Sequence, residues 1–404
     1  MSGRKKKSNV VSARKNWPQW QGPNRDARST EKGLLKKWPQ QGPELLWSAE
    51  KLGQGFSSVS IANGLIYTTG IIDKQGILSA FDLQGKFKWR KTYGPEWTKS
   101  YPDSRCTPTV HEGSIYIISG LGAVSCFDAD TGDKNWSFDA FTEFAGEQPR
   151  WGIAESPLIV GDLVICTPGG EKATMVALHK KTGQVVWASR SIGEPSSYCS
   201  PVLIRKGTKS LIVTMTSNFI IGVNSQDGNI LWQYDCKLYQ GKPKDVNPNT
   251  PIYKDGCIYV TSGYGKGGAK LRLSQDGGSV VSQEWVNLAL DCHHGGVVLV
   301  DGFIYGSNMA GDWVCVNWGS GEVMYQTEGI GKGSITYADG MLYCYEENKG
   351  TVGLVRATPE KFDLVSSFKV PLGKGKNWAH PVICDGRLYI RHGDALMVYD
   401  IKAE

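Results

Sequence analysis

Residues 107–136 read TPTVHEGSIYIISGLGAVSCFDADTGDKNW, and this stretch is one copy of a unit that recurs eight times along the chain. The unit contains a small residue with Pro and an apolar run, an Asp/Glu/Asn-Gly pair, an apolar residue with Tyr, a Gly-rich turn, an apolar-Asp-x-x-x-Gly run and a final Trp. Three other copies are clear: Ser156 to Trp187, Ser200 to Trp232 and Thr250 to Trp285. Three are weaker: Ser58 to Trp89, Gly296 to Tyr325 and Ser334 to Phe368. A period of about 40 to 50 residues made of short strands is typical of propeller blades.

The turns inside the unit predict strands. Asp301-Gly302 and Asp339-Gly340 each separate two apolar runs, which is a strong signal for a β-hairpin. Four strands of five or six residues, with their turns, use about 40 residues. No window shows sustained helical periodicity, so we expect almost no helix. The fold class is therefore predicted to be all-β, with four-stranded antiparallel blades.

The eighth copy predicts how the ring closes. It begins at His380-Pro381 and ends at Ile401 without a closing aromatic residue, whereas an aromatic residue stands near the N-terminus, at Trp47. We expect 44–47 to complete the last blade as its outer strand, because closure removes the exposed edge of an open array. The prediction is an eight-bladed β-propeller closed by an N-terminal strand, with the Trp of each unit buried between adjacent blades.

The chain is predicted to have three parts. Residues 44–404 form the propeller, and residues 17–43 wrap its surface, held there by Trp17, Trp20 and Trp38. Residues 1–16 form a basic, disordered tail that carries six of the charges behind the formal net charge of +6. Because the propeller itself is close to neutral, we expect no nucleic-acid partner.

The compartment is predicted from the start of the chain. Residues 8–16 lack the apolar core of a secretory signal, and no run of 18 apolar residues could span a membrane. Ten cysteines occur without a CxxC or an adjacent pair, and several fall within apolar strand runs, as buried thiols do. These observations predict a cytoplasmic monomer; a leader missing from the chain would make it periplasmic instead.

Several motifs resemble a known family. Residues 17–26 (WPQWQGPNRD), 151–157 (WGIAESP), 166–170 (CTPGG), 293–296 (HHGG) and 332–340 (KGSITYADG) are similar to those of bacterial PQQ-like (pyrroloquinoline quinone repeat) propellers. The repeat of this family is shared with quinoprotein alcohol dehydrogenases and with outer-membrane assembly lipoproteins. The resemblance extends from Trp17 onward, and it implies the propeller fold without fixing an activity.

The register of the repeats predicts a site at one mouth of the central channel, which the first strand of each blade lines. Equal offsets in homologous strands point the same way, because side chains alternate between faces. Three residues before the repeat Pro or its equivalent, the ring reads Phe56, Arg105, Ala154, Tyr198, Pro248, His294, Lys332 and Trp378. The next ring contains Glu155 and Asn249, and the one after it contains His380. The predicted ligand-binding residues are Phe56, Arg105, Glu155, Tyr198, Asn249, His294, Lys332, Trp378 and His380.

Structural roles compete with this interpretation. Arg105 and Glu155 belong to neighbouring blades and could form an ion pair that closes the channel. Adjacent strand residues face opposite ways, so one of His293 and His294 is expected to pack and the other to face the channel. Trp378 and Tyr198 could pack between blades.

Two functions remain open. The favoured one is a ligand-binding or protein-interaction scaffold without a cofactor, whose channel mouth takes a carbohydrate or small molecule, or whose rim docks a protein. The alternative, implied by the resemblance, is a quinoprotein alcohol or sugar dehydrogenase that holds PQQ and Ca²⁺. That enzyme would use Glu155 and Asn249 as calcium ligands, Asp291 as base, Arg105 and Lys332 as cations near the quinone, and Trp378 for stacking. The adjacent-cysteine pair and the CxxCH haem site associated with such enzymes are absent from the sequence.

Overall fold

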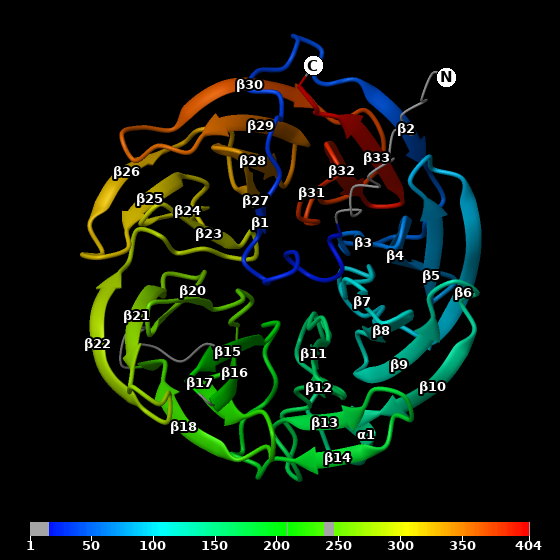
Figure 1. The fold of residues 1–404 in the computed structure, drawn as a ribbon, viewed down its shortest axis with the longest axis vertical. Helices are drawn as coiled ribbons and strands as arrows, with labels where there is room; N and C mark the ends of the chain where they lie inside the picture. The colour runs from blue at the N-terminus through cyan, green and yellow to red at the C-terminus, as the bar shows by residue number, and fades with distance from the viewer. Residues whose placement is uncertain (1–15, 208, 238–245, 404) are drawn as a thin grey trace, which may run out of the picture.

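The chain forms a closed ring of eight sheets, as Figure 1 shows. The computed structural model describes residues 16–207, 209–237 and 246–403. The predicted eight-bladed, all-β propeller is confirmed. Helix is scarce in the described residues, with α1 (Ala140–Glu143) a single short turn after the second blade.

The first four blades each contain four consecutive antiparallel strands. They comprise β3 (Ser60–Ala62), β4 (Leu65–Ile72), β5 (Gln75–Asp82) and β6 (Phe87–Pro95); β7 (Thr109–His111), β8 (Ser114–Ile118), β9 (Ala123–Asp128) and β10 (Lys134–Asp139); β11 (Leu158–Val160), β12 (Leu163–Cys166), β13 (Val176–His179) and β14 (Val185–Ala188); and β15 (Val202–Lys206), β16 (Lys209–Met215), β17 (Phe219–Asn224) and β18 (Ile230–Asp235).

The next three blades follow the same order, and the eighth differs in its outer strand. They comprise β19 (Ile252–Lys254), β20 (Cys257–Ser262), β21 (Gly267–Leu273) and β22 (Val280–Asn287); β23 (Val297–Val300), β24 (Phe303–Ser307), β25 (Trp313–Asn317) and β26 (Val323–Thr327); β27 (Gly333–Ala338), β28 (Met341–Glu346), β29 (Thr351–Arg356) and β30 (Asp363–Lys369); and β31 (Val382–Cys384), β32 (Arg387–His392) and β33 (Ala395–Asp400).

The ring closes where predicted. The N-terminal strand β2 (Leu45–Ala49) pairs antiparallel with β33, and Trp47 lies opposite Val398. The last blade therefore has the order β2-β33-β32-β31, and the two ends of the propeller are hydrogen-bonded to each other.

The two hairpins singled out in the sequence turn as predicted. At Asp301-Gly302 and Asp339-Gly340 both residues have positive φ, between 48° and 87°. This is the geometry of the type I′ turn, whose twist matches that of the strands and which favours Asp or Asn followed by Gly.

A Trp–Gly contact joins one blade to the next. The indole of Trp136, in β10, lies on Gly183 of the third blade, where a Cβ atom would stand 2.6 Å from the ring. Its Nε1 donates to the carbonyl of Lys180 at 2.9 Å. The contact recurs at Trp47–Gly85, Trp89–Gly132, Trp187–Gly228 and Trp285–Gly321. The repeat residues Trp and Gly therefore form the inter-blade contact that was predicted for Trp.

Apolar side chains fill the space between neighbouring blades. One buried cluster joins the fourth and fifth blades through Val213, Trp232, Ile258 and Leu271, and another joins the sixth and seventh through Tyr305 and Leu342. Each blade therefore depends on its neighbours for a core, as in repeat proteins generally.

Residues 17–31 cross the central channel, as the blue trace in the middle of Figure 1 shows. Trp17 exchanges two backbone hydrogen bonds with Ile61, each of 2.8 Å. β1 (Arg28–Ser29) pairs in parallel with β27. Fully buried Arg25 donates to the carbonyls of Ser156, Pro157 and Pro201, so it links the third and fourth blades. The segment ties distant blades together.

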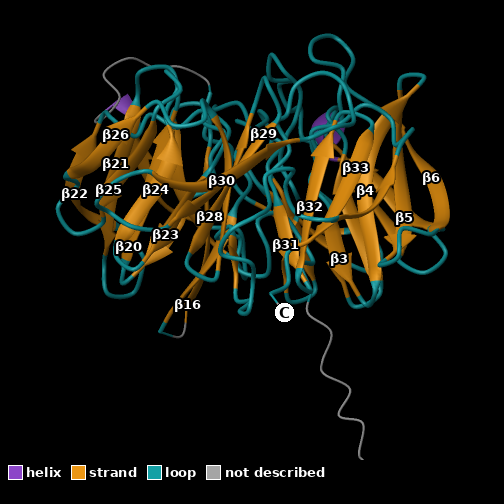
Figure 2. Cartoon of the chain, turned by 90° about the horizontal axis from the view of Figure 1, so that it is seen from above, coloured by secondary structure: helices purple, strands orange, loops and turns teal. Residues whose placement is uncertain are grey.

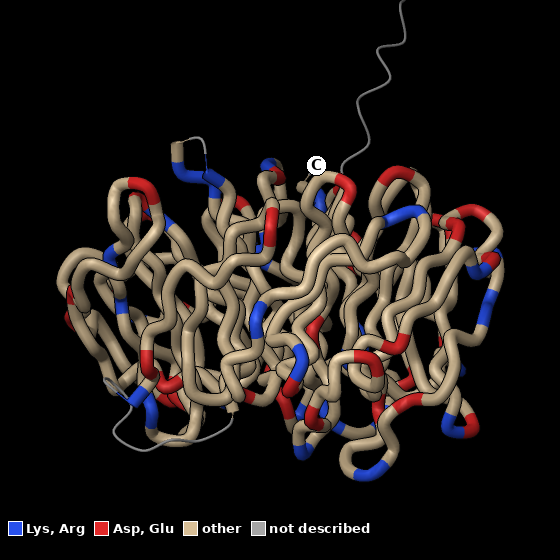
Figure 3. The backbone as a smooth tube through the Cα atoms, turned by 90° about the horizontal axis from the view of Figure 1, so that it is seen from below, with Lys and Arg blue, Asp and Glu red and all other residues tan. Residues whose placement is uncertain are grey.

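The two faces of the ring differ in side view. Figure 2 shows long loops on one face of the ring. Lys and Arg residues are interspersed with Asp and Glu residues along the loops in Figure 3, and neither sign forms a continuous face.

Candidate functional site at the channel mouth

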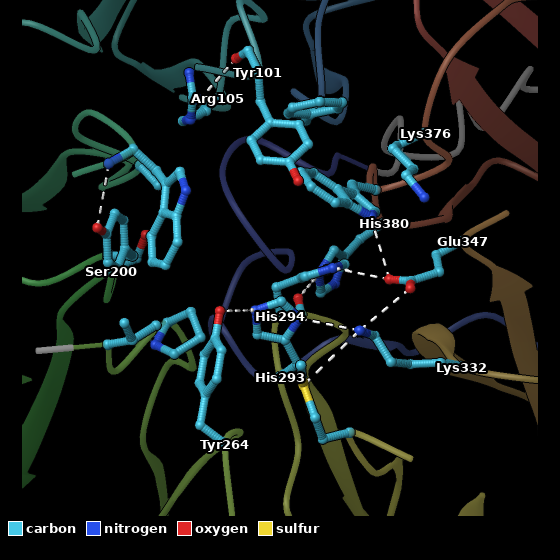
Figure 4. Close-up of a pocket in the computed structure, with 18 of the residues that line it drawn as sticks. Tyr101, Arg105, Ser200, Tyr264, His293, His294, Lys332, Glu347, Lys376 and His380 are labelled. Carbon is cyan, nitrogen blue, oxygen red and sulfur yellow. Dashed lines mark hydrogen bonds and ion pairs between the residues drawn. The ribbon is translucent and has the colours of Figure 1, made fainter. Parts of the chain in front are cut away.

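A cavity of about 410 Å³ lies at the mouth of the central channel (Figure 4). Every position of the predicted outer ring lines it, from all eight blades: Phe56, Arg105, Ala154, Tyr198, Pro248, His294, Lys332 and Trp378. His380 also lines the cavity. The register of the repeats therefore located these side chains correctly, because each precedes the first strand of its blade by a similar offset.

Aromatic rings form a cluster on one side of the cavity, around Trp378. The ring centroid of Trp378 lies 4.7 Å from that of Phe56, 5.0 Å from that of Tyr101 and 4.8 Å from that of His294. Trp151 and Tyr198 form a second pair, with centroids 5.7 Å apart. Trp378 contributes to the cavity wall, which answers the alternative that it packs only between blades.

A polar network adjoins this aromatic cluster. The Nζ of Lys332 lies 3.1 Å from Nδ1 of His293 and 3.2 Å from Oε1 of Glu347. The second oxygen of Glu347 lies 3.1 Å from Nε2 of His294 and accepts a hydrogen bond from Nε1 of Trp378 at 3.2 Å. Nε2 of His293 lies 3.0 Å from the hydroxyl of Tyr264. Both oxygens of Glu347 are thus used within the wall.

Burial controls the charges of this network. Burial lowers the pKa of His293 to about 2 and that of His380 to about 4, and it also lowers the pKa of His294, so all three imidazoles are neutral at pH 7. Burial opposes ionisation of Glu347, but its contacts with His294 and Lys332 outweigh this effect and lower its pKa to about 2. Because His294 is neutral, we attribute the ionised state of Glu347 mainly to Lys332.

The two histidines both line the cavity, contrary to the prediction that only one would. Their ring centroids are 4.4 Å apart. The expectation rested on strand alternation, but the pair lies in the irregular segment before β23, where this alternation does not apply.

Arg105 does not pair with Glu155. Its guanidinium donates to the backbone carbonyls of Asp103, at 2.6 Å, and of Ser100 and Tyr101. Glu155 instead accepts hydrogen bonds from the backbone and hydroxyl of Thr167. The predicted channel-closing ion pair is therefore wrong, because each group is held by its own blade.

Glu155 and Asn249 lie outside the cavity lining, although both belong to the predicted site. Glu155 is 1% exposed, and burial raises its pKa to about 8. The amide of Asn249 donates to the carbonyls of Thr261, Cys292 and His293, which fixes the loop that leads into the sixth blade. Glu155 and Asn249 stand one residue closer to the first strand of their blades than the cavity-lining residues do. Their side chains therefore point into the blades rather than into the channel.

Other lining residues come from segments that the ring alignment does not include. Tyr264, Met309 and Glu347 lie in loops between the second and third strands of their blades, while Tyr101, Trp151 and Lys376 lie further upstream of the first strands. Trp20 reaches the cavity from the N-terminal segment, where its Nε1 donates to Thr250 and its ring lies 4.5 Å from that of His380. Among the lining residues outside the ring alignment, Trp20, Trp151 and His293 stood in motifs that could have drawn attention to them.

The proposed calcium ligands do not fit a metal site. Both oxygens of Asp291 accept backbone N–H groups of 265–267, while Glu155 and the amide of Asn249 are used as described above. The three groups have no shared contact, and no cluster of three His, Cys, Asp or Glu side chains suited to a metal occurs within the described residues. Arg105, Lys332 and Trp378, by contrast, do line the cavity.

The comparisons with known proteins agree with the fold. The family model described as "Outer membrane protein assembly factor BamB" matches residues 73–327. The chain is 23% identical over 316 residues to BamB of Moranella endobia, covering 74% of this chain and 77% of that protein. It is 25% identical over 178 residues to the quinoprotein alcohol dehydrogenase PedH of Pseudomonas putida, covering 42% of this chain and 27% of that protein.

A solved structure shares the same ring. The crystal structure of BamB from Moraxella catarrhalis superposes with a TM-score of 0.66 at 17% identity, covering 89% of this chain and 99% of that chain. This likeness supports the fold alone.

The predicted cytoplasmic location is wrong. The matched family and several relatives are outer membrane protein assembly factors, which belong to the cell envelope. The prediction relied on the first residues of the chain, and these do not determine the compartment. Within the described residues, no helix has the length and apolar character to cross a membrane. From residue 73 to residue 327, the repeats and their blades match one family model, and the chain belongs to the family of outer membrane protein assembly factor BamB.

Proposed function

We propose that this protein is a binding scaffold of the bacterial envelope and that the cavity at the channel mouth is its ligand site. The family supports a scaffold with a protein partner, because its members are named as assembly factors. In this proposal the site takes a small molecule or a side chain that a partner inserts, and the protein works on the periplasmic side of the outer membrane.

The aromatic cluster around Trp378 carries the proposal. Trp378 and Phe56 are half-buried, and Tyr101 is 48% exposed, so these rings stand in the mouth rather than in a blade core. Stacked rings beside fixed hydrogen-bonding groups are typical of pockets that bind small polar molecules. The neighbouring network of Lys332, Glu347 and His293 supplies such fixed groups.

The test is a binding screen with two matched variants. Wild type, Trp378→Ala and Phe87→Ala are titrated by calorimetry with sugars, organic acids, short peptides, and PQQ with Ca²⁺. Phe87 is an exposed aromatic residue on the outer strand β6, so its variant controls for non-specific contact with rings. A cavity ligand should bind Trp378→Ala about 5- to 150-fold more weakly, the loss of about 1–3 kcal/mol expected for an anchoring ring, and should bind Phe87→Ala unchanged.

Two results would contradict the proposal. If no compound distinguishes Trp378→Ala from Phe87→Ala, the cavity is not the ligand site. If PQQ with Ca²⁺ binds and supports dye-linked alcohol oxidation, the protein is an enzyme and the scaffold interpretation is wrong.

A further inference from the structure

The charges of the cavity lining do not balance. The described lining contains three cations, Arg105, Lys332 and Lys376, and one anion, Glu347, while its three imidazoles are neutral at pH 7 because burial lowers each pKa. Lys332 and Glu347 lie 3.2 Å apart and compensate each other. The excess positive charge therefore belongs to Arg105 and Lys376.

Arg105 is held in place without being neutralised. Its three hydrogen bonds go to backbone carbonyls, which orient a guanidinium but carry no net charge. The carboxyls nearest to it in electrostatic terms are Glu96 and Asp103, and neither forms an ion pair with the guanidinium. The oxygens of Glu96 instead accept hydrogen bonds from the Tyr93 hydroxyl and from the N–H groups of Trp97 and Gly120.

Lys376 is a second cation of this kind. Its Nζ donates to the amide oxygen of Asn348 at 2.6 Å, a neutral partner. In the part of the chain that the structure describes, neither Arg105 nor Lys376 forms an ion pair with a carboxylate. Figure 4 shows Arg105 and Lys376 on opposite sides of Tyr101. The aromatic cluster at the mouth is thus flanked by two cations that have no direct ion-pair partner among the described residues.

We infer that the ligand of this cavity carries a carboxylate on a ring-sized or apolar body. The body would stack on Trp378, Phe56 or Tyr101, and the carboxylate would accept hydrogen bonds from Arg105 or Lys376. A charge-assisted hydrogen bond is about twice as strong as a neutral one, so these cations would favour an acid over its neutral analogue. The inference rests on the proposed function of the cavity and narrows it to acids, which are either free molecules or acidic side chains of a partner chain.

The experiment uses pairs of probes in which a carboxylate replaces a neutral group on the same body. Calorimetry on the whole protein compares glucuronate with glucose, phenylacetate with phenylacetamide, and acetyl-Ala-Glu-Ala-amide with acetyl-Ala-Gln-Ala-amide. At least one acid should bind about tenfold or more tightly than its neutral partner, and added salt should weaken that preference. Preference within the ring pairs indicates a free organic acid, while preference confined to the peptide pair indicates a partner's side chain; both support carboxylate recognition.

Variants connect the preference to the two cations. Arg105→Gln and Lys376→Gln should each reduce the acid-to-neutral ratio, whereas Lys254→Gln, at the far end of β19 from the mouth, should leave it unchanged. Lys376 is exposed, so its variant keeps the test valid if Arg105→Gln disturbs the loop that Arg105 holds.

The two proposals fail in different ways. If the affinities of the neutral probes lie within twofold of those of the acids, carboxylate recognition is wrong, while the cavity is still the ligand site. The same conclusion follows if ligands from the Trp378 screen bind both cation variants as they bind wild type. If no compound in either experiment binds in a manner that depends on Trp378, both proposals are wrong.

Discussion

Two buried glutamates show how position within a blade determines the charge of a residue. Glu155 points into the third blade and receives hydrogen bonds from Thr167, yet burial raises its pKa to about 8. Glu347 lies at the cavity wall beside Lys332, and its pKa falls to about 2. The same type of side chain is therefore a neutral acid inside a blade and an anion at the cavity wall.

The two glutamates should affect stability with opposite dependence on pH. The folded-state pKa of Glu155 lies above its ordinary value of 4.5, so the folded state keeps a proton that the unfolded state releases, and stability falls as pH rises from about 4.5 to about 8. The melting temperature of Glu155→Gln relative to wild type should therefore rise between pH 5 and pH 9. The measurement is thermal unfolding by circular dichroism at one-unit pH steps.

Glu347→Gln provides the contrast. Its folded-state pKa lies below 4.5, so the stability that ionised Glu347 contributes is present above pH 4.5 and is lost as pH falls toward 2. This variant should melt below wild type at pH 7, with the gap narrowing in acid. Two flat difference curves would show that neither pKa shift exists in the folded protein.

At the scale of elements, the outer strand of each blade contains a β-bulge, where its pairing with the third strand shifts by one residue. The register shifts between Leu45 and Trp47 in β2 and between Lys134 and Trp136 in β10, and the other six blades have a shift at the equivalent place. A bulge bends the strand and changes where a side chain points. In five blades it accompanies a Trp that lies on a Gly of the next blade, whereas Tyr325 and Ser366 stand at that place in the sixth and seventh blades.

The contact can be tested at two glycines with the same backbone conformation. Gly321 and Gly113 both have φ of 77°, but a Cβ atom at Gly321 would stand 2.6 Å from Trp285, whereas a Cβ atom at Gly113 meets nothing within 4 Å. Both Ala variants bear the cost of positive φ. Gly321→Ala should lower the free energy of unfolding by about 1–3 kcal/mol more than Gly113→Ala, the usual cost of overpacking. Equal losses in urea denaturation would mean that the indole moves aside freely.

The repeats predicted those parts of the site that depend on strand register. Arg105, Lys332 and Trp378 were placed correctly, since residues at the same offset from homologous strands share a direction. Glu347 and Tyr264 were not found, because loop conformations bring them to the cavity and no repeat pattern encodes these. The neutral state of His293 likewise depends on burial in the assembled ring, which cannot be deduced from its neighbours in sequence.

At the scale of the whole molecule, the ring is held closed by one strand pair contributed by opposite ends of the chain. β2 and β33 pair as other outer strands do, and Trp47 lies on Gly85 of the first blade. Because this pair joins the two ends of the ring, the stability of the propeller should depend on closure more than on any one blade.

All ten cysteines are buried, so the thiols are shielded from solvent in any compartment.

Removing the closing strand should be worse than removing its aromatic ring. Deletion of residues 44–47 exposes the edge of β33, so the protein should aggregate and lose thermal stability. Trp47→Ala keeps the strand pair and should lower the melting temperature while leaving the protein monomeric. Light scattering after size-exclusion chromatography distinguishes the two; a monomeric, stable deletion variant would show that β2 is dispensable for closure.

Residues 17–31 lie across the central channel and contribute Trp20 to the cavity lining. Since Arg25 of this segment also joins the third and fourth blades, we expect a bound molecule to enter and leave through the same opening. Exchange would then require the first molecule to depart, and with the newcomer in excess the rate of exchange would equal the rate of departure.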